Sequence, residues 1–235
     1  MDIGRAIRRR MGLLTLGKVA RRVSADRLTY LPVEKLRRVE GAIKRTFTVP
    51  GDILEFGVAL GGSGIILAHD TRPGRHFHGF DVFGMIPPPL SSKDDARSKE
   101  RYEIIRSGQS KGIGNDKYYG YRTDLYGDVI ASFAHHGVGV DNKSIILHKG
   151  LFEDTWPAAG IESAALVHID CDWYDPVLFC LNSCAEILSH NGLIVIDDYN
   201  DYGGCRTAVD EFLAHHSEFT FEPGLNPILW KNKPL

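Results

Sequence analysis

The chain has 235 residues, which is enough for one large domain or two small ones. Apolar residues make up 43% of it and charged residues 25%, proportions that exclude a disordered chain, a collagen-like fibre and a disulfide scaffold. The net charge of −2 is unevenly spread, because residues 1–45 carry 13 Lys and Arg against 4 Asp and Glu, whereas the rest carry 15 against 26. The composition therefore predicts a folded, acidic body behind a basic N-terminal arm.

The basic arm, residues 1–48, is predicted to be helical. A basic segment in front of an acidic body is compatible with contact to nucleic acid or to a membrane surface. Neither interleaved aromatic residues nor a nucleic-acid-binding module accompanies the charge, so we favour an amphipathic helix that packs on the body or on a second subunit. We therefore expect a homo-oligomer that uses the arm, and no nucleic acid among the partners.

The start of the chain imitates a targeting signal. Arg5, Arg8, Arg9 and Arg10 precede a short apolar stretch that glycines interrupt, which is too short for a secretory signal, while an organelle transit peptide stays open. The longest apolar runs are strand-sized and far below the roughly 20 residues that span a bilayer. Four cysteines without a CxxC pair are typical of buried thiols in a reducing compartment. We expect a cytoplasmic protein without stable membrane insertion.

Strands and helices alternate along the rest of the chain. Apolar residues at three- and four-residue spacing predict a helix over residues 33–47. This alternation predicts an α/β fold with a mostly parallel sheet, helices on both faces and a C-terminal antiparallel hairpin at the sheet edge. Strands are predicted over residues 53–58, 76–80, 144–148, 164–169, 192–196, 219–222 and 227–230, and further helices over residues 62–69, 125–136, 176–190 and 205–216.

Residues 82–123 interrupt this alternation. They contain Pro87, Pro88 and Pro89, then a charged stretch and a stretch rich in Gly and Tyr. Long insertions in compact domains are usually functional or mobile, and ligands bind at the carboxyl ends of the strands in open α/β sheets. We therefore expect an active-site lid that is inserted in a main domain of residues 49–235.

The first motif with chemical meaning is the predicted strand-to-helix turn at residues 55–63. Gly57, Gly62 and Ser63 let the backbone approach a ligand at a helix N-terminus, although the spacing is neither GxGxxG nor that of a P-loop. Glu55 lies two residues before the first glycine, and an acidic residue there suits a ligand with an amino group. The methionine portion of S-adenosylmethionine is such a ligand, and a tight turn without a ligand is the alternative.

Asp81 ends the second predicted strand, 26 residues after Glu55. A carboxylate at this place can accept both ribose hydroxyls of a nucleoside. The two motifs together predict a nucleoside-containing cofactor.

Two acidic pairs follow the fourth and fifth predicted strands. Asp170 and Asp172 come after the fourth strand, and Asp197 and Asp198 follow the fifth. Parallel neighbouring strands end at one edge of the sheet, so we expect four carboxylates that repel one another strongly unless a cation lies among them. A donor set of oxygen atoms favours Mg²⁺ over zinc. The alternative is that these aspartates are solvated loop acids and helix caps. Two pairs of acids at the ends of two neighbouring strands disfavour this alternative.

These motifs resemble those of the macrocin O-methyltransferase family, metal- and S-adenosylmethionine-dependent enzymes that methylate sugar hydroxyls of glycosylated natural products. The resemblance covers about residues 50–212, and its most specific parts are the DxD and DDY elements. The sequence departs from the family where Val82 and the proline run replace an Asp-Ser-Phe-x-Gly pattern. The segments that carry the resemblance are residues 55–63, 81–87, 150–157, 170–174, 197–199 and 204–209.

The resemblance implies a Rossmann-like class I methyltransferase fold with a seven-stranded sheet, S-adenosylmethionine and Mg²⁺ as cofactors, and a small-molecule glycoside as the acceptor. Asp170, Asp197 and Asp198 would hold Mg²⁺. Asp172 is the predicted general base, Asp170 is the second catalytic candidate, and His168 is expected to be a core histidine. The residues implied to bind the cofactor are Glu55, Phe56, Gly57, Gly62, Ser63, Asp81, Gly150 and Phe152.

Two other function classes stay open from the sequence. A metal-dependent catechol or phenol O-methyltransferase shares the fold and the metal chemistry, and activity on glycosides but not on catechols would separate the two. A non-catalytic module that binds a nucleotide or a partner would fail to bind S-adenosylmethionine. A hydride-transferring Rossmann enzyme is disfavoured, because GxGxxG is missing.

Overall fold

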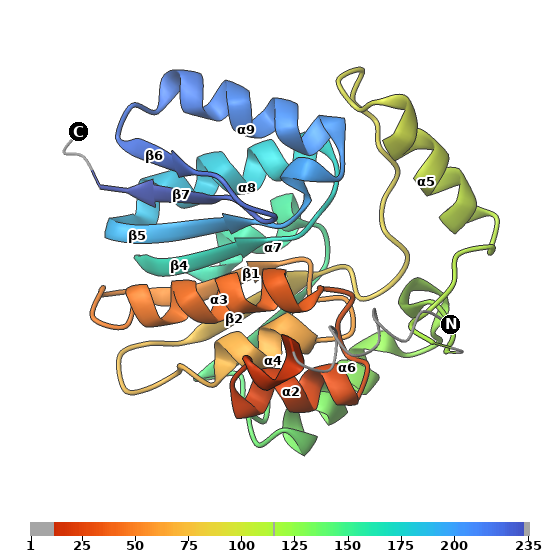
Figure 1. Cartoon of the computed structure of the whole chain (residues 1–235), viewed down its shortest axis with the longest axis horizontal. Coiled ribbons are helices and arrows are strands. Elements are labelled where there is room, and N and C mark those ends of the chain that lie inside the picture. The colour runs from red at the N-terminus through yellow and green to blue at the C-terminus, as the bar shows by residue number, and fades with distance from the viewer. Residues whose placement is uncertain (1–11, 115, 233–235) are drawn as a thin grey trace.

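The computed structural model describes residues 12–114 and 116–232, and within them seven strands form one sheet in the order β3-β2-β1-β4-β5-β7-β6 (Figure 1). Strands β1 to β5 are parallel to their neighbours, whereas β7 is antiparallel to both β5 and β6. The predicted mostly parallel seven-stranded sheet with a C-terminal hairpin is therefore confirmed. The strands are β1 Asp52–Phe56, β2 Phe77–Asp81, β3 Ile145–Lys149, β4 Ala164–Ile169, β5 Leu188–Ile196, β6 Phe219–Glu222 and β7 Ile228–Lys231.

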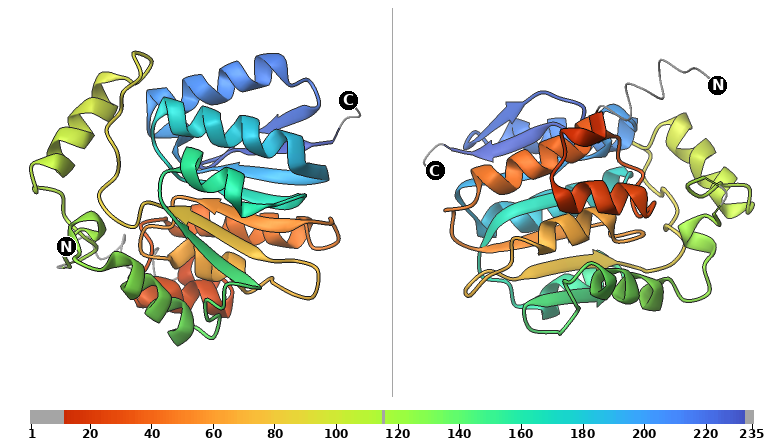
Figure 2. Two further views of the ribbon diagram at one scale, coloured as in Figure 1. Left: turned by 180° about the vertical axis from the view of Figure 1, so that it is seen from behind. Right: turned by 60° about the horizontal axis from the view of Figure 1, so that its bottom comes forward.

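Helices cover both faces of this sheet (Figures 1 and 2). On one face α2, α3, α4 and α6 enclose a core that includes Ile53 and Leu166, and on the other α7, α8 and α9 enclose a core that includes Phe56 and Val167. No helix in the described part of the chain has both the length and the apolar character needed to cross a bilayer. The helices are α2 Lys18–Ala25, α3 Val33–Arg45, α4 Gly62–Ala68, α5 Ala96–Arg106, α6 Leu125–His135, α7 Phe152–Ala159, α8 Tyr174–Ile187 and α9 Gly203–His215, with short 3₁₀ turns at Tyr119–Tyr121 and Asp198–Asn200.

The N-terminal arm packs on the body of its own chain. In α3 the residues Leu36, Val39 and Ala42 recur at three-residue spacing, and all three are buried. Both α2 and α3 contact α4, and α3 also contacts β5. The apolar stripe of the arm thus forms part of the hydrophobic core. The early arginines of the targeting-like segment lie outside the described residues.

The boundary between α8 and β5 differs from the prediction. The helix was expected over residues 176–190, but α8 ends at Ile187 and β5 begins at Leu188. Asn191 and the glycine after it resemble a turn, yet the strand continues through them, with φ 66° at Asn191 and a register shift against β4. The prediction of helix through residue 190 is wrong because a strand irregularity replaces the expected turn.

The inserted residues 82–123 lie beyond the carboxyl ends of the parallel strands, and α5 stands away from the helices that cover the sheet (Figure 2). Only Ser98 and Ile105 of α5 are buried. Asp95 caps the helix by accepting a hydrogen bond from the backbone N–H of Ser98 at 2.8 Å. The insertion is therefore ordered around one exposed helix at the edge where an active site is expected.

Candidate active site

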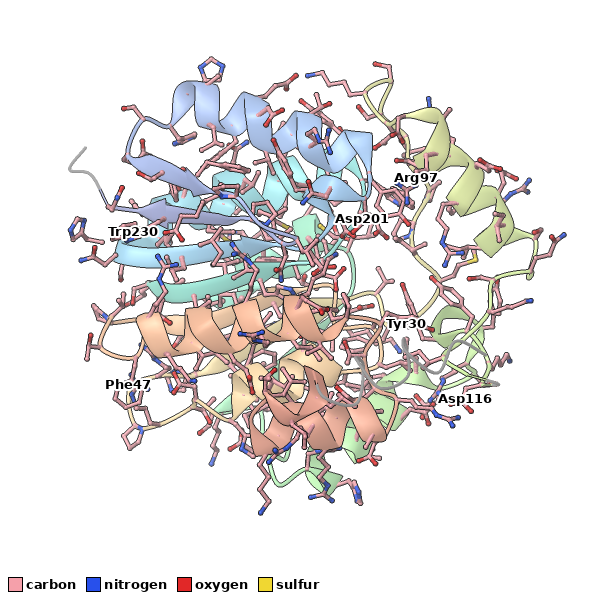
Figure 3. All side chains as sticks on the ribbon, in the orientation of Figure 1. Tyr30, Phe47, Arg97, Asp116, Asp201 and Trp230 are labelled. Carbon is pink, nitrogen blue, oxygen red and sulfur yellow. The ribbon has the colours of Figure 1, made fainter. Side chains whose placement is uncertain are left out.

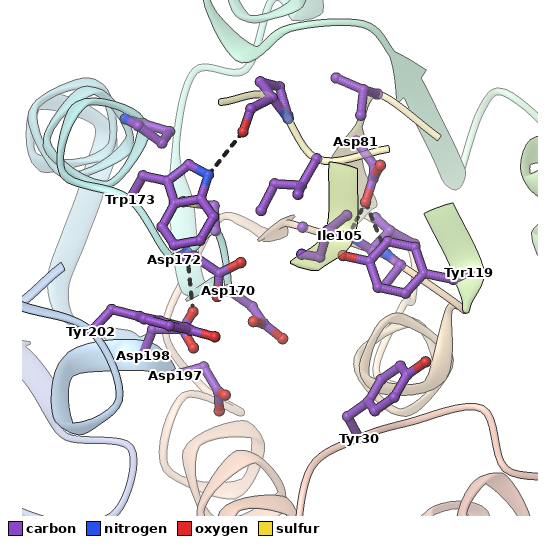
Figure 4. A pocket seen from close by; sticks show the side chains of 18 of the residues that line it. Tyr30, Asp81, Ile105, Tyr119, Asp170, Asp172, Trp173, Asp197, Asp198 and Tyr202 are labelled. Atoms are coloured by element: carbon purple, nitrogen blue, oxygen red, sulfur yellow. Dashed lines mark hydrogen bonds between the residues drawn. The ribbon is translucent and has the colours of Figure 1, made fainter. Parts of the chain in front are cut away.

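A cavity of about 740 Å³ lies at the carboxyl ends of β1, β2, β4 and β5 (Figure 4). Its walls come from the strand ends, from the connection between α2 and α3, and from the insertion. This is the edge of an open α/β sheet at which ligands bind. The two regions that precede and interrupt the sheet thus close the site.

The four predicted carboxylates meet on one wall of the cavity. Asp170, Asp172 and Asp198 can each offer an oxygen within 4.8 Å of the others, and Asp197, Asp198 and Asp201 form a second such group. The backbone N–H of Asp172 donates to Oδ2 of Asp198 at 3.2 Å, which connects the two loops (Figure 4). The structure therefore groups the acids differently from the predicted triplet of Asp170, Asp197 and Asp198.

The crowding of these acids changes their protonation. Burial raises the pKa of Asp170 and of Asp198 well above the usual value of a carboxyl group, and the neighbouring aspartate charges raise it further. Burial also raises the pKa of Asp172 to about 6. Several carboxylates cannot all ionise in a poorly solvated wall unless positive charge offsets them. Some of these acids therefore stay protonated unless a positive charge lies beside them.

Lys35 supplies one positive charge from α3. Its Nζ lies 2.8 Å from Oδ2 of Asp197 and 2.8 Å from Oδ2 of Asp201. Burial alone would lower the pKa of Lys35, but the two aspartates outweigh it and raise the pKa above its ordinary value, so the ammonium stays charged. The sequence analysis missed both Lys35 and Asp201. A lysine at helical spacing from Val39 and Ala42 on a buried stripe was the available signal.

The turn after β1 approaches the cavity through its backbone. A Cβ on Gly57 would lie 1.8 Å from the carbonyl oxygen of Asp170, and the φ of 94° at Gly57 is in the left-handed region. A Cβ on Gly62 would lie 2.3 Å from the carbonyl oxygen of Leu28, since the arm lies directly on this turn. Glycine is needed at both places, and Ser63 lines the cavity beside them.

Asp81 lines the same part of the cavity and fixes the turn. Its Oδ2 accepts from the backbone N–H groups of Val58 and Ala59 at 2.8 and 2.9 Å, and its Oδ1 accepts from that of Phe83 at 2.6 Å. Burial raises the pKa of Asp81, whereas these three donors lower it. Oδ2 already accepts two hydrogen bonds, but Oδ1 accepts only one, so Oδ1 can still bind a hydroxyl group.

Glu55, which the sequence predicted as a direct cofactor contact, does not line the cavity. It shares a strand face with Ile53, and its Oε1 lies 3.0 Å from Nδ1 of His168 in the core. Burial alone would lower the pKa of His168, but the hydrogen bond and charge of Glu55 raise it. The alternation of a strand explains the difference, because residues two apart point to the same face. His168 is the core histidine that the sequence analysis expected.

The remaining predicted cofactor residues are divided between the cavity and its support. Phe152 lines the cavity, whereas Phe56 is fully buried in the core beside it, with the two rings 5.3 Å apart. Gly150 donates its backbone N–H to the carbonyl oxygen of Asp81 at 3.0 Å. Neither Phe56 nor Gly150 lines the cavity, so both support residues that do.

Aromatic side chains form a further part of the cavity wall, with Trp173 and Tyr202 on one side and Tyr30 and Tyr119 on the other (Figure 4). Trp173 and Tyr202 meet with ring centroids 5.3 Å apart, and Trp173 donates its indole N–H to the carbonyl oxygen of Pro87 at 2.9 Å. Tyr30 of the arm and Tyr119 of the insertion approach to 6.1 Å. The sequence analysis missed this wall, since residues from four separate segments build it.

Comparisons with known proteins show the family to which this chain belongs. The family model of macrocin-O-methyltransferase (TylF) matches residues 25–220. The chain is 26% identical over 197 residues to the demethyldecarbamoylnovobiocin O-methyltransferase of Streptomyces niveus, covering 81% of this chain and 69% of that protein. It is 28% identical over 203 residues to the mycinamicin III 3''-O-methyltransferase of Micromonospora griseorubida, with coverage of 80% and 71%. The solved structure of the O-methyltransferase NovP has the same fold, with a TM-score of 0.71 at 23% identity over 88% of this chain and 82% of that one.

Proposed function

The chain belongs to the macrocin-O-methyltransferase family, and from this premise we propose that it transfers the methyl group of S-adenosylmethionine to a sugar hydroxyl of a small glycosylated molecule. The observation that carries the proposal is the convergence of four aspartates beside a glycine-rich turn in one cavity. The named relatives are O-methyltransferases of demethyldecarbamoylnovobiocin and of mycinamicin III, which supports a natural product as the acceptor.

The cofactor would lie against the turn after β1. Gly57, Gly62 and Ser63 allow the close approach of a ligand, and Oδ1 of Asp81 would accept a hydrogen bond from a ribose hydroxyl. Phe152 would pack against the adenine ring as an apolar wall. Glu55, by contrast, would act from the core through its contact with His168.

The acid cluster fits Mg²⁺. Its donors are oxygen atoms only, and Asp170, Asp172 and Asp198 can each offer one within 4.8 Å of the others. We propose that Asp170 and Asp198 hold the ion, since Mg²⁺ commonly takes one or two carboxylates and keeps its other positions for water and substrate. When bound, it would lower the pKa of the acceptor hydroxyl and orient it. Asp197, held by Lys35, would support this arrangement from the side.

Asp172 is the proposed general base. It lines the cavity two residues beyond Asp170, and the bond from its backbone N–H to Asp198 fixes its position. Its carboxylate would take the proton of the acceptor hydroxyl while the oxygen forms a bond to the methyl carbon and the bond from that carbon to sulfur breaks. The aromatic wall of Trp173 and Tyr202 would exclude water and orient the sugar ring.

Self-association and location complete the proposal. We propose a homo-oligomer, although the apolar stripe of α3 is already buried in its own body, so the contact would use the outer surface of the arm. All four cysteines are buried free thiols, which supports a reducing compartment such as the cytoplasm.

The decisive test is methyl transfer from labelled S-adenosylmethionine to a panel of glycosides and catechols, with Mg²⁺ or with excess chelator. We expect transfer to glycosides that chelator abolishes. Transfer to catechols alone would favour the catechol enzyme, and full activity in chelator would remove the metal. Absence of S-adenosylmethionine binding by calorimetry would favour a non-catalytic module.

Asp172→Asn tests the base. Removing a general base typically lowers the rate by ~10²–10⁴-fold, so we expect a fall of this order in kcat with little change in cofactor and Mg²⁺ affinity. Asp170→Asn is the matched variant and should weaken Mg²⁺ binding. If Asp172→Asn weakens Mg²⁺ binding equally, Asp172 is a metal ligand and the base must be sought elsewhere.

A further inference from the structure

Two arginines on the insertion line the cavity. Arg97 and Arg101 lie one helical turn apart on α5, and both line the cavity. Across residues 12–114 and 116–232, no carboxylate oxygen lies within 4.0 Å of either guanidinium, whereas Arg106 on the same helix pairs with Glu103 at 2.6 Å. Arg97 projects from α5 toward the side of the cavity on which Asp201 lies (Figure 3).

Both guanidinium groups lie over aromatic rings. Arg97 Cζ is 5.6 Å from the ring centroid of Tyr202, and Arg101 Cζ is 5.7 Å from that of Tyr118. A guanidinium over a ring stays charged and keeps its N–H groups available at the edges of its plane, where they can meet an anion bidentately. Tyr202 and Tyr118 therefore orient the two guanidinium groups, each with several N–H donors in one plane, toward the cavity.

These arginines do not serve as direct partners of the acid cluster. Lys35 already performs that function, with contacts of 2.8 Å to both Asp197 and Asp201. The cavity thus has an acidic wall at the strand ends and a basic wall on the insertion. An acceptor that reaches both walls would present a hydroxyl to the acids and an anion to the arginines.

We propose that Arg97 and Arg101 bind a phosphate ester of the acceptor, so that the sugar is methylated as a sugar phosphate or as a nucleoside diphosphate sugar. The inference rests on the proposed function. Side chains at i and i+4 of a helix are ~5–6 Å apart at their Cβ atoms, a spacing that one phosphate or diphosphate with several oxygens can bridge. A neutral glycoside in the cavity would offer no anion to either guanidinium group.

The test is calorimetric binding of inorganic pyrophosphate, uridine diphosphate, thymidine diphosphate and glucose 1-phosphate to the full chain at constant ionic strength, with chelator present. Arg97→Gln and Arg101→Gln should each weaken binding roughly 10-fold to 100-fold, the effect of losing hydrogen bonds to a charged group. Lys99→Gln, on the same helix but outside the cavity lining, is the matched control and should change binding less than about twofold. Arg101→Lys keeps the positive charge but loses the planar set of N–H donors. Its affinity for the probes should lie between that of Arg101→Gln and that of the unaltered chain.

The probes separate the two sources of phosphate, since tighter binding of the nucleoside diphosphates supports a nucleotide sugar, and tighter binding of glucose 1-phosphate supports a sugar phosphate. Absence of binding by all four probes, or an equal loss of affinity in Lys99→Gln, would overturn the inference.

S-adenosylmethionine binding is measured on the same samples. If the arginine variants weaken only that binding, the arginines contact the cofactor and the inference is wrong. If S-adenosylmethionine does not bind the unaltered chain, the proposed function fails instead.

Discussion

The N-terminal arm and the insertion both close the cavity, but they are attached to the body in different ways. The arm contributes Leu36 and Val39 to the core, and its Lys35 pairs with Asp197 of the acid cluster. The insertion contributes Phe83 to the core at its start, whereas polar contacts join its middle part to the body, such as the bond from Gly203 N–H to Asp95 at 3.0 Å. Regions with few buried apolar contacts open at lower free-energy cost than those that share the core. We therefore expect the arm to be a fixed wall and the insertion to be the wall that moves.

The largest effect is expected where the arm enters the site. Lys35→Met should destabilise the fold by ~3–5 kcal/mol, because it leaves Asp197 charged and buried without its partner. Lys18→Met, at an exposed position of α2, is the control for the loss of one charge in the arm. The measurement is urea unfolding in chelator, and equal stability of the two variants would contradict a structural role for the Lys35 pair.

The next comparison uses one apolar truncation in each region. Leu36→Ala removes a side chain that is 1% exposed and should cost ~2–5 kcal/mol. Ile104→Ala, on α5 at 37% exposure, should change the free energy of unfolding by less than about 0.5 kcal/mol. Similar losses in both variants, again by urea unfolding, would show that the insertion is packed as firmly as the arm.

The same contrast explains what the sequence could predict. Strands were found because buried parallel strands are short, nearly continuous apolar runs, and the meeting of Asp170 with Asp198 followed from two such strands being neighbours. Contacts between distant segments were not predictable in this way. Lys35 lies 162 residues from Asp197, and only the packing of α3 on the sheet brings them together. Glu55 was assigned to the cavity by its place before the glycines, although strand alternation turns it into the core.

Limited proteolysis with trypsin tests which wall moves, because the arm and the insertion both carry several Lys and Arg residues. We expect the first cuts within residues 82–123, and at least about tenfold slower cutting within α3, since cleavage follows the population of the open form. S-adenosylmethionine together with an accepted glycoside should slow the cuts in the insertion. First cuts in α3 would count against a moving lid, and so would a rate of cutting in the insertion that the two ligands leave unchanged.

The smallest effect is expected at the polar contact that holds the start of the insertion. Nζ of Lys93 lies 2.7 Å from Oε2 of Glu211 on α9, and both side chains are more than 40% exposed. Because exposed ion pairs contribute little to global stability, Glu211→Gln should leave the melting temperature unchanged. It should nevertheless speed tryptic cutting of the insertion by about twofold to fivefold, since a weak contact still shifts the local opening equilibrium.

The control is Glu186→Gln, at an exposed position of α8. It removes the same charge without touching the insertion and should leave the cutting rate unaltered. If both variants cut alike, the contact between Lys93 and Glu211 does not hold the lid, and the bond from Trp173 to Pro87 becomes the stronger candidate, because the indole that makes it is itself fully buried.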